Sequence, residues 1–359
     1  MSLLNPFERR DIRSMGSTAS FIVQGQHLVP NNLISAMEAL KNSDLYSVTS
    51  LISSDIAGAD FIGTNENVEL LNKPNTLSNK VNFWQTVVLN LLLSGNAFIY
   101  LEKNPEGIIT NMRPIPSSMV TVDLTDDVLS YDIMAYDTFL GGTASADEMI
   151  HARIMAYGES PLDALVGHSP LEALGNEVAQ QKEATRLTLS TIKNAINPTS
   201  VIQIPEGTLS KEAKDTVRNE FEQANTGENS GRVMVLDQSA DFKTISINAD
   251  VAKYLTQLDW GRNQITKTFG VPDSYLNGQG DQQSSLDQIS ALYVGGLNRY
   301  IEPLLSELNF KLGGGIRLDM SQIMDYSKTT FKKDISDWVK NGVLTPDEAK
   351  QLLIRKEVI

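Results

Sequence analysis

The stretch from Asp250 to Leu312 constrains the fold more than any other part of the chain. Apolar residues recur there at helical spacing until Gly270-Val271-Pro272, which marks a stop because glycine relaxes the backbone and proline lacks the N–H that a helix needs. A polar stretch, 277–285, follows without a single apolar residue. A second helical pattern then runs over 286–308. The sequence therefore predicts two long helices joined by a loop whose tip touches something moving or variable.

Pro303 falls inside the second of these helices. A proline inside a helix removes one backbone hydrogen bond and clashes with the carbonyl four residues earlier, which kinks the helix. Proline is also favoured in the first turn of a new helix. Two interpretations stay open at this position: one long kinked helix, or two helices that meet at Pro303.

The remaining patterns are those of an α+β protein. Short strand patterns with turns between them predict a mostly antiparallel sheet. Ser169-Pro170 opens a further helix, with serine as the N-cap and proline in the first turn. The expected helices are 31–57, 83–93, 169–194, 250–269 and 326–340, with another opened by the capping box at Thr345; the expected strands are 97–101, 119–122, 129–133 and 149–154, and a small α/β module spans 199–248.

Composition excludes several classes of site. The chain has no cysteine and three scattered histidines, so thiolate and histidine metal sites are not expected, and we expect no metal and no cofactor. The formal net charge of −14 argues against a protein that grips nucleic-acid phosphates over its whole surface. An acidic protein can still let DNA slide past without sticking. The apolar run 87–93 is interrupted by Asn90 and is too short to span a bilayer, so no membrane partner is expected.

Catalytic motifs are weak. Gly278-Gln279-Gly280 begins like a dinucleotide fingerprint but lacks the third glycine. His151 lies in a strand pattern and is best interpreted as a buried or half-buried structural residue, whereas His168 precedes a helix start and is expected to cap it or to pack at an interface. We therefore expect no enzyme. The alternative is an acidic hydrolase with a mobile lid, which would use carboxylates such as Asp281 or Asp287 and would need a paired carboxylate in a cleft.

Six short segments occur together in an order that is typical of one family. They are Leu70-Leu71-Asn72-Lys73-Pro74-Asn75, Ser94-Gly95-Asn96-Ala97-Phe98-Ile99, Arg113-Pro114-Ile115-Pro116, Glu148-Met149-Ile150-His151, Gly167-His168-Ser169-Pro170-Leu171 and Phe269-Gly270-Val271-Pro272-Asp273. With these segments, over about residues 30–310, the chain resembles the portal proteins of tailed bacteriophages, in the HK-ninety-seven-like class.

The resemblance implies an elongated portal architecture of α+β class. Its parts would be a flexible N-terminal arm (1–29), a wing (30–169), a first stem helix (170–198), a clip (199–248), a second stem helix (249–275), a channel loop (276–286), a long kinked helix (287–316) and a helical crown (317–359). Twelve copies would form a ring, in which one face of a subunit meets a different face of the next.

The resemblance also implies function and partners. The ring would sit at one capsid vertex of the virion, after assembly in the bacterial host cytoplasm, and pass double-stranded DNA in during packaging and out during ejection. It would dock the terminase large subunit, the major capsid protein and a head-completion adaptor; the runner-up is another structural head–tail adaptor. The channel loop would present Asn277, Gly278, Gln279, Gly280, Asp281, Gln282, Gln283, Ser284 and Ser285. The basic residues that could face the channel are Arg186, Lys193, Lys253, Arg262 and Lys267, although we expect most to be solvated or paired with carboxylates of a neighbouring subunit.

Overall fold

A computed structural model provides the structure of the chain. It describes residues 20–24, 27–31, 40–135, 141–158, 161–196, 200–203, 210–212, 215–216, 219, 241–244, 251–277, 286–324 and 328–355. The chain divides into two compact units, one built from residues 1–175 and 263–359 and the other from residues 176–262.

The first unit is built on two antiparallel sheets that share a core. A three-stranded sheet has the order β5-β4-β9, and a five-stranded sheet has the order β1-β2-β6-β7-β8. Phe98 and Met149 from the first sheet pack with Val122, Tyr131 and Ile133 from the second. The strands are β1 (Ser20–Gln24), β2 (His27–Asn31), β4 (Asn96–Lys103), β5 (Ile109–Ile115), β6 (Val120–Thr125), β7 (Val128–Ile133), β8 (Gly142–Ser145) and β9 (Met149–Arg153). The α+β class expected from the sequence is confirmed.

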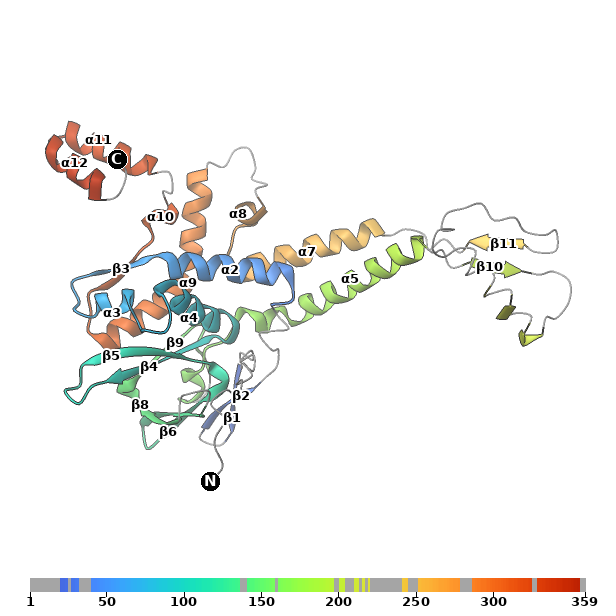
Figure 1. The fold of residues 1–359 in the computed structure, drawn as a ribbon, viewed down its shortest axis with the longest axis horizontal. Coiled ribbons are helices and arrows are strands. Elements are labelled where there is room, and N and C mark those ends of the chain that lie inside the picture. Colours follow the sequence, from blue (N-terminus) through green and yellow to red (C-terminus); the bar gives the residue numbers. More distant parts are fainter. Residues whose placement is uncertain are drawn as a thin grey trace, which may run out of the picture. The chain divides into compact units, whose positions relative to one another are not determined.

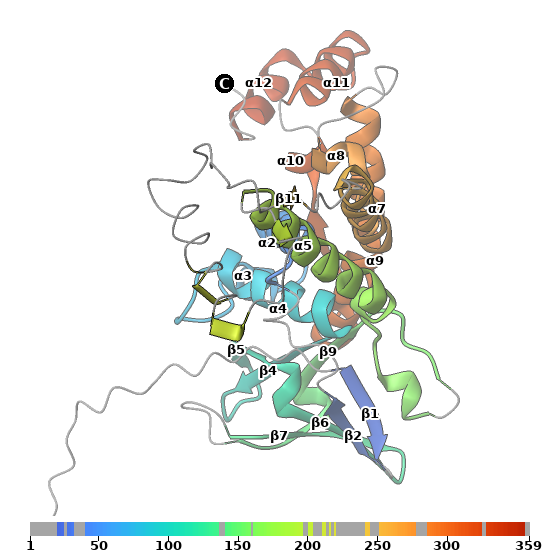
Figure 2. The ribbon, with the colours of Figure 1, turned by 90° about the vertical axis from the view of Figure 1, so that its right-hand side faces the viewer.

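Helices cover the other face of the three-stranded sheet. Helix α4 (Lys80–Ser94) lies between β4 and α2 (Ser43–Gly58), and the views in Figures 1 and 2 show both helices on the side of this sheet opposite to β6 and β7. Asn42 caps α2 and Asn79 caps α4, each through a side-chain oxygen that accepts backbone N–H groups. Gly95, with φ of 77°, ends α4 in the left-handed conformation that glycine adopts readily.

The long helix α9 (Leu286–Leu312) packs against this assembly. It contacts β9, α2 and α4, and it runs without interruption through Pro303. Of the two interpretations left open at Pro303, a boundary between two helices is therefore wrong. Leu297, Tyr300, Leu304 and Leu308 are buried along one face, so packing offsets the backbone hydrogen bond that Pro303 removes.

The structure differs from the sequence prediction at both margins of this unit. Residues 20–24 and 27–29, expected in a flexible arm, form β1 and β2, because Phe21-Ile22-Val23 favours a strand and Leu28 pairs with Val122 of β6. Residue 31, expected to open a helix, also belongs to β2. Residues 317–319, expected in the crown, lie in β12 (Ile316–Asp319), which pairs with β3 (Asp60–Gly63).

The exposed edge of β5 is protected against pairing with another strand. The Met112 N–H donates to the Pro74 carbonyl at 2.9 Å, and Pro114 has no N–H to offer. Unpaired strand edges invite association with other chains, and proline at the edge is one way in which proteins prevent it. These two features therefore oppose the addition of another strand beside β5.

The described residues of the second unit include parts of two long helices and a small strand pair. Helix α5 (Gly175–Ile196) and α7 (Val251–Phe269), whose first part belongs to this unit, flank β10 (Ser200–Gln203) and β11 (Asp241–Thr244) in the sequence. The two strands pair antiparallel. Gly261 of α7 lies directly against the Gln181 side chain of α5, so the helices approach closely at this point. Most of the remaining residues of the α/β module expected at 199–248 lie outside the described residues.

The C-terminal helices follow the predicted pattern with small shifts. They are α10 (Ser321–Met324), α11 (Thr329–Lys340) and α12 (Pro346–Arg355). Thr345 and Glu348 form the expected capping box, with the Thr345 hydroxyl and N–H both donating to the Glu348 carboxylate at 2.7 and 2.8 Å. Among the helices of the described residues, none combines the length and the apolar character needed to cross a bilayer.

Candidate functional site

The predicted channel loop is framed by described residues on both sides. Gly278–Ser285 lie outside the described residues, and α9 begins at Leu286. Asn277, expected in the loop, instead ends a short helix, α8 (Asp273–Asn277). This helix starts directly after Pro272, whose carbonyl accepts the Tyr275 N–H at 3.0 Å. Sequence reasoning missed α8 because five residues are too few for a helical period to stand out.

The Phe-Gly-Val-Pro motif ends α7 in a way that requires its residues. Gly270 has φ of 75°, its N–H donates to the Lys267 carbonyl, and the Val271 N–H reaches the Thr266 carbonyl at 2.9 Å. These two bonds define a Schellman motif, in which glycine takes the left-handed position and the next residue packs back on the helix. Val271 is 3% exposed, as this motif expects. The motif fixes the direction in which the chain leaves α7.

The backbone of this turn lies directly against the backbone of helix α9. A Cβ at Gly296 would collide with the Gly270 carbonyl oxygen, so only glycine allows the two backbones to approach. The Tyr300 hydroxyl donates to the Phe269 carbonyl at 2.9 Å. Burial raises the pKa of Tyr300, which keeps the hydroxyl protonated as a donor. The end of α7 is thereby fixed to α9.

A second tyrosine of α9 joins two further helices. The Tyr293 hydroxyl donates to Asp55 Oδ2 of α2 at 2.6 Å, and the Tyr275 ring of α8 stacks on the Tyr293 ring with centroids 4.2 Å apart. Burial raises the pKa of the Asp55 carboxyl, and the hydrogen bond from Tyr293 opposes that shift. We call Asp55, Tyr275 and Tyr293 the Asp55 junction. Helix α8 thus lies beside α9, as Figure 2 shows.

A cavity of about 300 Å³ adjoins the Asp55 junction. It is lined by Ser54, Asp55, Gly58, Ala59, Tyr275, Asp319 and Ile323. Ser54 and Gly58 on its rim are exposed, so the cavity opens to solvent, and packed atoms do not enclose the Tyr275 ring on this side. Across the described residues, no three histidine, aspartate or glutamate side chains gather as metal ligands, here or elsewhere.

Three of the six segments noted in the sequence converge on one buried polar cluster. Asn96 Oδ1 accepts the Gly167 N–H at 2.9 Å and lies 3.0 Å from His151 Nε2, while Asn96 Nδ2 donates to the Ser94 and Gly167 carbonyls. The His151 ring stacks on Phe98 at 4.2 Å, and its Nδ1 lies 3.4 Å from the Tyr131 hydroxyl. We call Ser94, Asn96, Tyr131, His151 and Gly167 the His151 junction.

The His151 junction is sealed from solvent. His151 is 1% exposed, which confirms the prediction of a buried structural histidine. Burial lowers the pKa of His151, and the nearby positive charges of Arg153 and Lys311 act in the same direction. The ring is therefore neutral at neutral pH. His168, expected to cap or pack, hydrogen-bonds to Glu172 through Nδ1 at 2.9 Å and lies against the Tyr157 ring.

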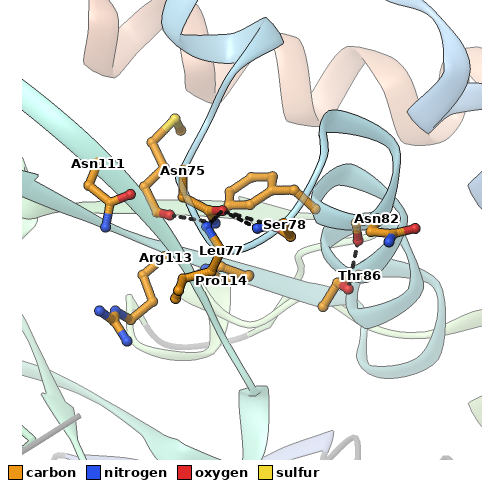
Figure 3. Close-up of a pocket in the computed structure, with 10 residues that line it drawn as sticks. Asn75, Leu77, Ser78, Asn82, Thr86, Asn111, Arg113 and Pro114 are labelled. Atoms are coloured by element: carbon orange, nitrogen blue, oxygen red, sulfur yellow. Dashed lines mark hydrogen bonds between the residues drawn. The ribbon is translucent and has the colours of Figure 1, made fainter. Parts of the chain in front are cut away.

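Two more of the segments meet at a second hollow, drawn in Figure 3. The Asn75 side chain donates to the Met112 carbonyl at 3.3 Å and accepts the Leu77 and Ser78 N–H groups. These bonds tie the turn before α4 to the strand that carries Arg113-Pro114. The hollow measures about 270 Å³ and is lined by Asn75, Leu77, Ser78, Asn82, Phe83, Thr86, Asn111, Met112, Arg113 and Pro114. All six segments therefore join elements of the fold to one another.

The basic residues singled out in the sequence are not gathered into a described site. Arg186 is exposed and pairs with Glu183 of its own helix at 3.5 Å, a weak surface ion pair. Lys267 is exposed in the last turn of α7, and Arg262 is half-buried. The side chains of Lys193 and Lys253 lie outside the described residues, as do those of Asp281 and Asp287.

Comparison with known proteins agrees with this architecture. The family model described as "Phage portal protein" matches residues 43–353. The chain is 19% identical over 273 residues to the portal protein of Enterobacteria phage HK97, and 23% identical over 300 residues to an uncharacterised protein of Rickettsia felis. These matches cover 72% and 80% of this chain. The chain spans 57 to 72% of the length of the curated relatives that it matches.

Solved structures are similar in fold. A chain in the neck of a native gene transfer agent particle, determined with C12 symmetry, matches 88% of this chain and 90% of its own length, with a TM-score of 0.63 and 19% identity. A portal protein of the HK97 family from Corynebacterium diphtheriae matches 80% of this chain and 96% of its own length, with a TM-score of 0.60 and 14% identity. The family match extends over most of the chain, from the α2 helix to α12, and includes every junction described above. The chain belongs to the phage portal protein family.

Proposed function

We propose that this protein is the subunit of a portal ring at one vertex of a phage or phage-like capsid. The observation that carries the proposal is the family match over residues 43–353, together with a fold similar to a particle neck determined with C12 symmetry. A ring of identical chains needs two different, complementary faces on each subunit. Twelve copies would enclose a channel for double-stranded DNA during packaging and ejection.

Residues 277–285, with the single acidic side chain of Asp281, form the proposed contact with the passing duplex. The support is their sequence, which holds no lysine or arginine, and the frame before the loop, where Gly270 and Tyr300 fix the end of α7 against α9. Phosphate contacts from basic residues produce strong binding. A loop without them suits a channel through which DNA must move. The net charge of −14 favours the same behaviour for the ring as a whole.

The proposed partners follow from this role. They are the terminase large subunit during packaging, the major capsid protein around the vertex and a head-completion adaptor afterwards, with assembly in the host cytoplasm. Lys193, Lys253, Arg262 and Lys267 would face solvent, a neighbouring subunit or the channel. Arg186 already has a carboxylate partner on its own helix, which favours the first of these roles for it.

A structural role also accounts for the carboxylate with the raised pKa. Asp55 lines a cavity with Asp319, which is the kind of setting that a hydrolase would need. Its carboxylate, however, accepts the hydrogen bond that joins α2 to α9. Asp55 thus has a function in holding helices, and no second function is proposed for it.

Negative-stain imaging of the purified protein tests the ring. We expect particles with a central hole, and a mass measurement that gives a large cyclic oligomer. Monomers at every salt and protein concentration would count against the ring.

Deletion of residues 278–285 tests the loop. Rings should still form, because the described frame is intact, while DNA packaging or retention falls. The control replaces the same eight residues with a glycine-serine segment of equal length, which keeps the reach of the loop and removes Asp281 and the glutamines. Normal packaging by the deletion variant would overturn the assignment of this loop.

A further inference from the structure

Helix α8 is too short to hold its own position. It has five residues, and isolated helices need roughly 12 or more residues to be even marginally stable in water. Its place must come from contacts with its neighbours. The ring stack between Tyr275 and Tyr293, with planes 17° apart, is the principal aromatic contact that the structure gives it. Aromatic pairs of this kind stabilise beyond the area that they bury.

Tyr293 and Tyr300 divide the task of anchoring between them. They are seven residues apart on α9, which places them on the same face of the helix, and both are at most 2% exposed. Tyr300 binds the end of α7 through the Phe269 carbonyl at 2.9 Å. Tyr293 binds Asp55 at 2.6 Å and carries the Tyr275 ring. One face of α9 therefore holds the two segments on either side of Gly270-Val271-Pro272 by separate contacts, a hydrogen bond to the end of α7 and a ring stack on α8.

We propose that Tyr293 is a positioning residue, which holds α8 through Tyr275 and is itself fixed by its hydrogen bond to Asp55 on α2. Helix α2 is a suitable anchor, because Leu45, Val48 and Ile52 on it are fully buried against the rest of the unit. The hydrogen bond fixes the tilt of the Tyr293 ring, and the ring fixes Tyr275. The Asp55 junction acts as a latch between α2 and the segment that leads to residue 278.

The neighbouring cavity makes this latch adjustable. Tyr275 lines the cavity, and so does Gly58, where an added Cβ would meet no atom within 4 Å. Loss of the hydrogen bond would let the two rings shift toward this space without first displacing packed atoms. A larger side chain at position 58 would fill the space and oppose the shift. The structure thus offers one substitution that should loosen α8 and another that should hold it.

Amide hydrogen exchange of the assembled protein, followed by mass spectrometry, tests the latch. Hydrogen bonds to charged groups contribute enough that losing one changes an equilibrium by roughly tenfold or more. In Tyr293→Phe we expect about tenfold faster exchange in peptides covering 273–277, with no change in β4. Asp55→Ala should have the same effect. Asp55→Asn should have a smaller one, because the amide oxygen still accepts a hydrogen bond.

Tyr300→Phe is the matched control. It removes the same atom from the same face of the same helix, but its bond goes to the end of α7. Exchange should rise at residues 266–271 and stay unchanged in α8. Gly58→Leu, combined with Tyr293→Phe, should return the exchange of α8 toward that of the unaltered protein. Equal effects of Tyr293→Phe and Tyr300→Phe on α8, or none from either, would overturn the proposal.

The latch rests on the proposed function only in its consequence for DNA. If residues 277–285 touch the duplex, Tyr293→Phe rings should retain packaged DNA less well than Tyr300→Phe rings. Faster exchange in α8 together with unaltered packaging would support the latch and count against the channel role of the loop. Unaltered exchange would overturn the latch, whatever packaging shows.

Discussion

The His151 junction and the Asp55 junction use similar chemistry in opposite surroundings. Each has an ionisable side chain and a tyrosine hydroxyl directed at it. An aromatic stack with centroids 4.2 Å apart supports each: Phe98 stacks on the histidine at the first, and Tyr275 stacks on the tyrosine at the second. At the first, the ionisable group is a neutral histidine whose pKa is lowered by complete burial. At the second, it is a half-buried carboxylate whose pKa burial raises, beside a cavity of about 300 Å³.

The difference separates a fixed part of the fold from an adjustable one. The Asn96 side chain uses both its oxygen and its amide group on partners from two distant segments, so its position is fully determined. Partly satisfied buried networks are costly, and complete ones rigidify a core. The Asp55 junction depends on one hydrogen bond and one ring stack. We therefore expect the His151 junction to determine stability and the Asp55 junction to determine local position.

Asn96→Ala should have the largest effect on stability. It would leave the His151 ring, the Gly167 N–H and two carbonyls buried without this partner, and each unsatisfied buried group costs about 1–3 kcal/mol. We expect the free energy of unfolding in urea to fall by about 3 kcal/mol or more. Asp55→Asn, measured in the same way, should cost less than about 1 kcal/mol. Similar losses for both variants would remove the distinction between the junctions.

Burial of the neutral His151 ring should make the stability of the protein depend on pH. Its folded pKa lies below the unfolded value of 6.5, so its contribution is fully present above pH 6.5 and is lost as pH falls below that value. The free energy of unfolding should therefore fall as pH drops below 6.5, because the unfolded chain takes up a proton at this ring and the folded chain does not. In His151→Gln this part of the slope should vanish, as measured by urea unfolding at each pH. An unaltered slope would mean that the buried ring is not the group responsible.

Removing one tyrosine hydroxyl from each junction compares the two junctions through smaller changes in stability. Tyr293→Phe removes a 2.6 Å bond to a carboxylate, whereas Tyr131→Phe removes a 3.4 Å contact with a neutral imidazole. Short bonds to charged groups are the stronger kind. We expect Tyr293→Phe to lower the free energy of unfolding by about 1 kcal/mol and Tyr131→Phe to lower it by less. A larger loss in Tyr131→Phe would contradict the view that Asn96, and not Tyr131, holds His151.

Much of the fold could be predicted from the sequence, because its elements are long or clearly bounded. The two long helices, the Gly270 stop and the caps at Ser169 and Thr345 all follow from local patterns, and the structure confirms them. The hairpin β1–β2 and helix α8 could not be predicted in this way. β1, β2 and α8 have only five residues each. Their contacts include residues far away in the sequence, such as Val122 for β2 and Tyr293 for α8.

The spacing of residues in the sequence does not predict the His151 junction or the Asp55 junction. The segments containing Asn96, His151 and Gly167 lie far apart in the sequence, and their separations of 55 and 71 residues do not indicate a hydrogen bond. Asp55 stands in no motif at all. Tyr293 and Tyr300 lie seven residues apart and so on one face of the predicted helix, but this spacing is also that of ordinary core residues and does not indicate a hydrogen bond from either hydroxyl.

The smallest effect should come from two adjacent glycines on α9, which test how closely this helix must approach the Gly270 turn. Gly295 is exposed and a Cβ there would meet no atom within 4 Å, so Gly295→Ala should raise the free energy of unfolding by about 0.5–1 kcal/mol through helix propensity. Gly296→Ala gains the same propensity but places its Cβ against the Gly270 carbonyl, so it should be less stable than the unaltered protein. Urea unfolding of the two variants gives the sign of each change. If both variants are stabilised, the turn can move away from α9 at little cost, and the close backbone contact does not fix the chain that enters α8.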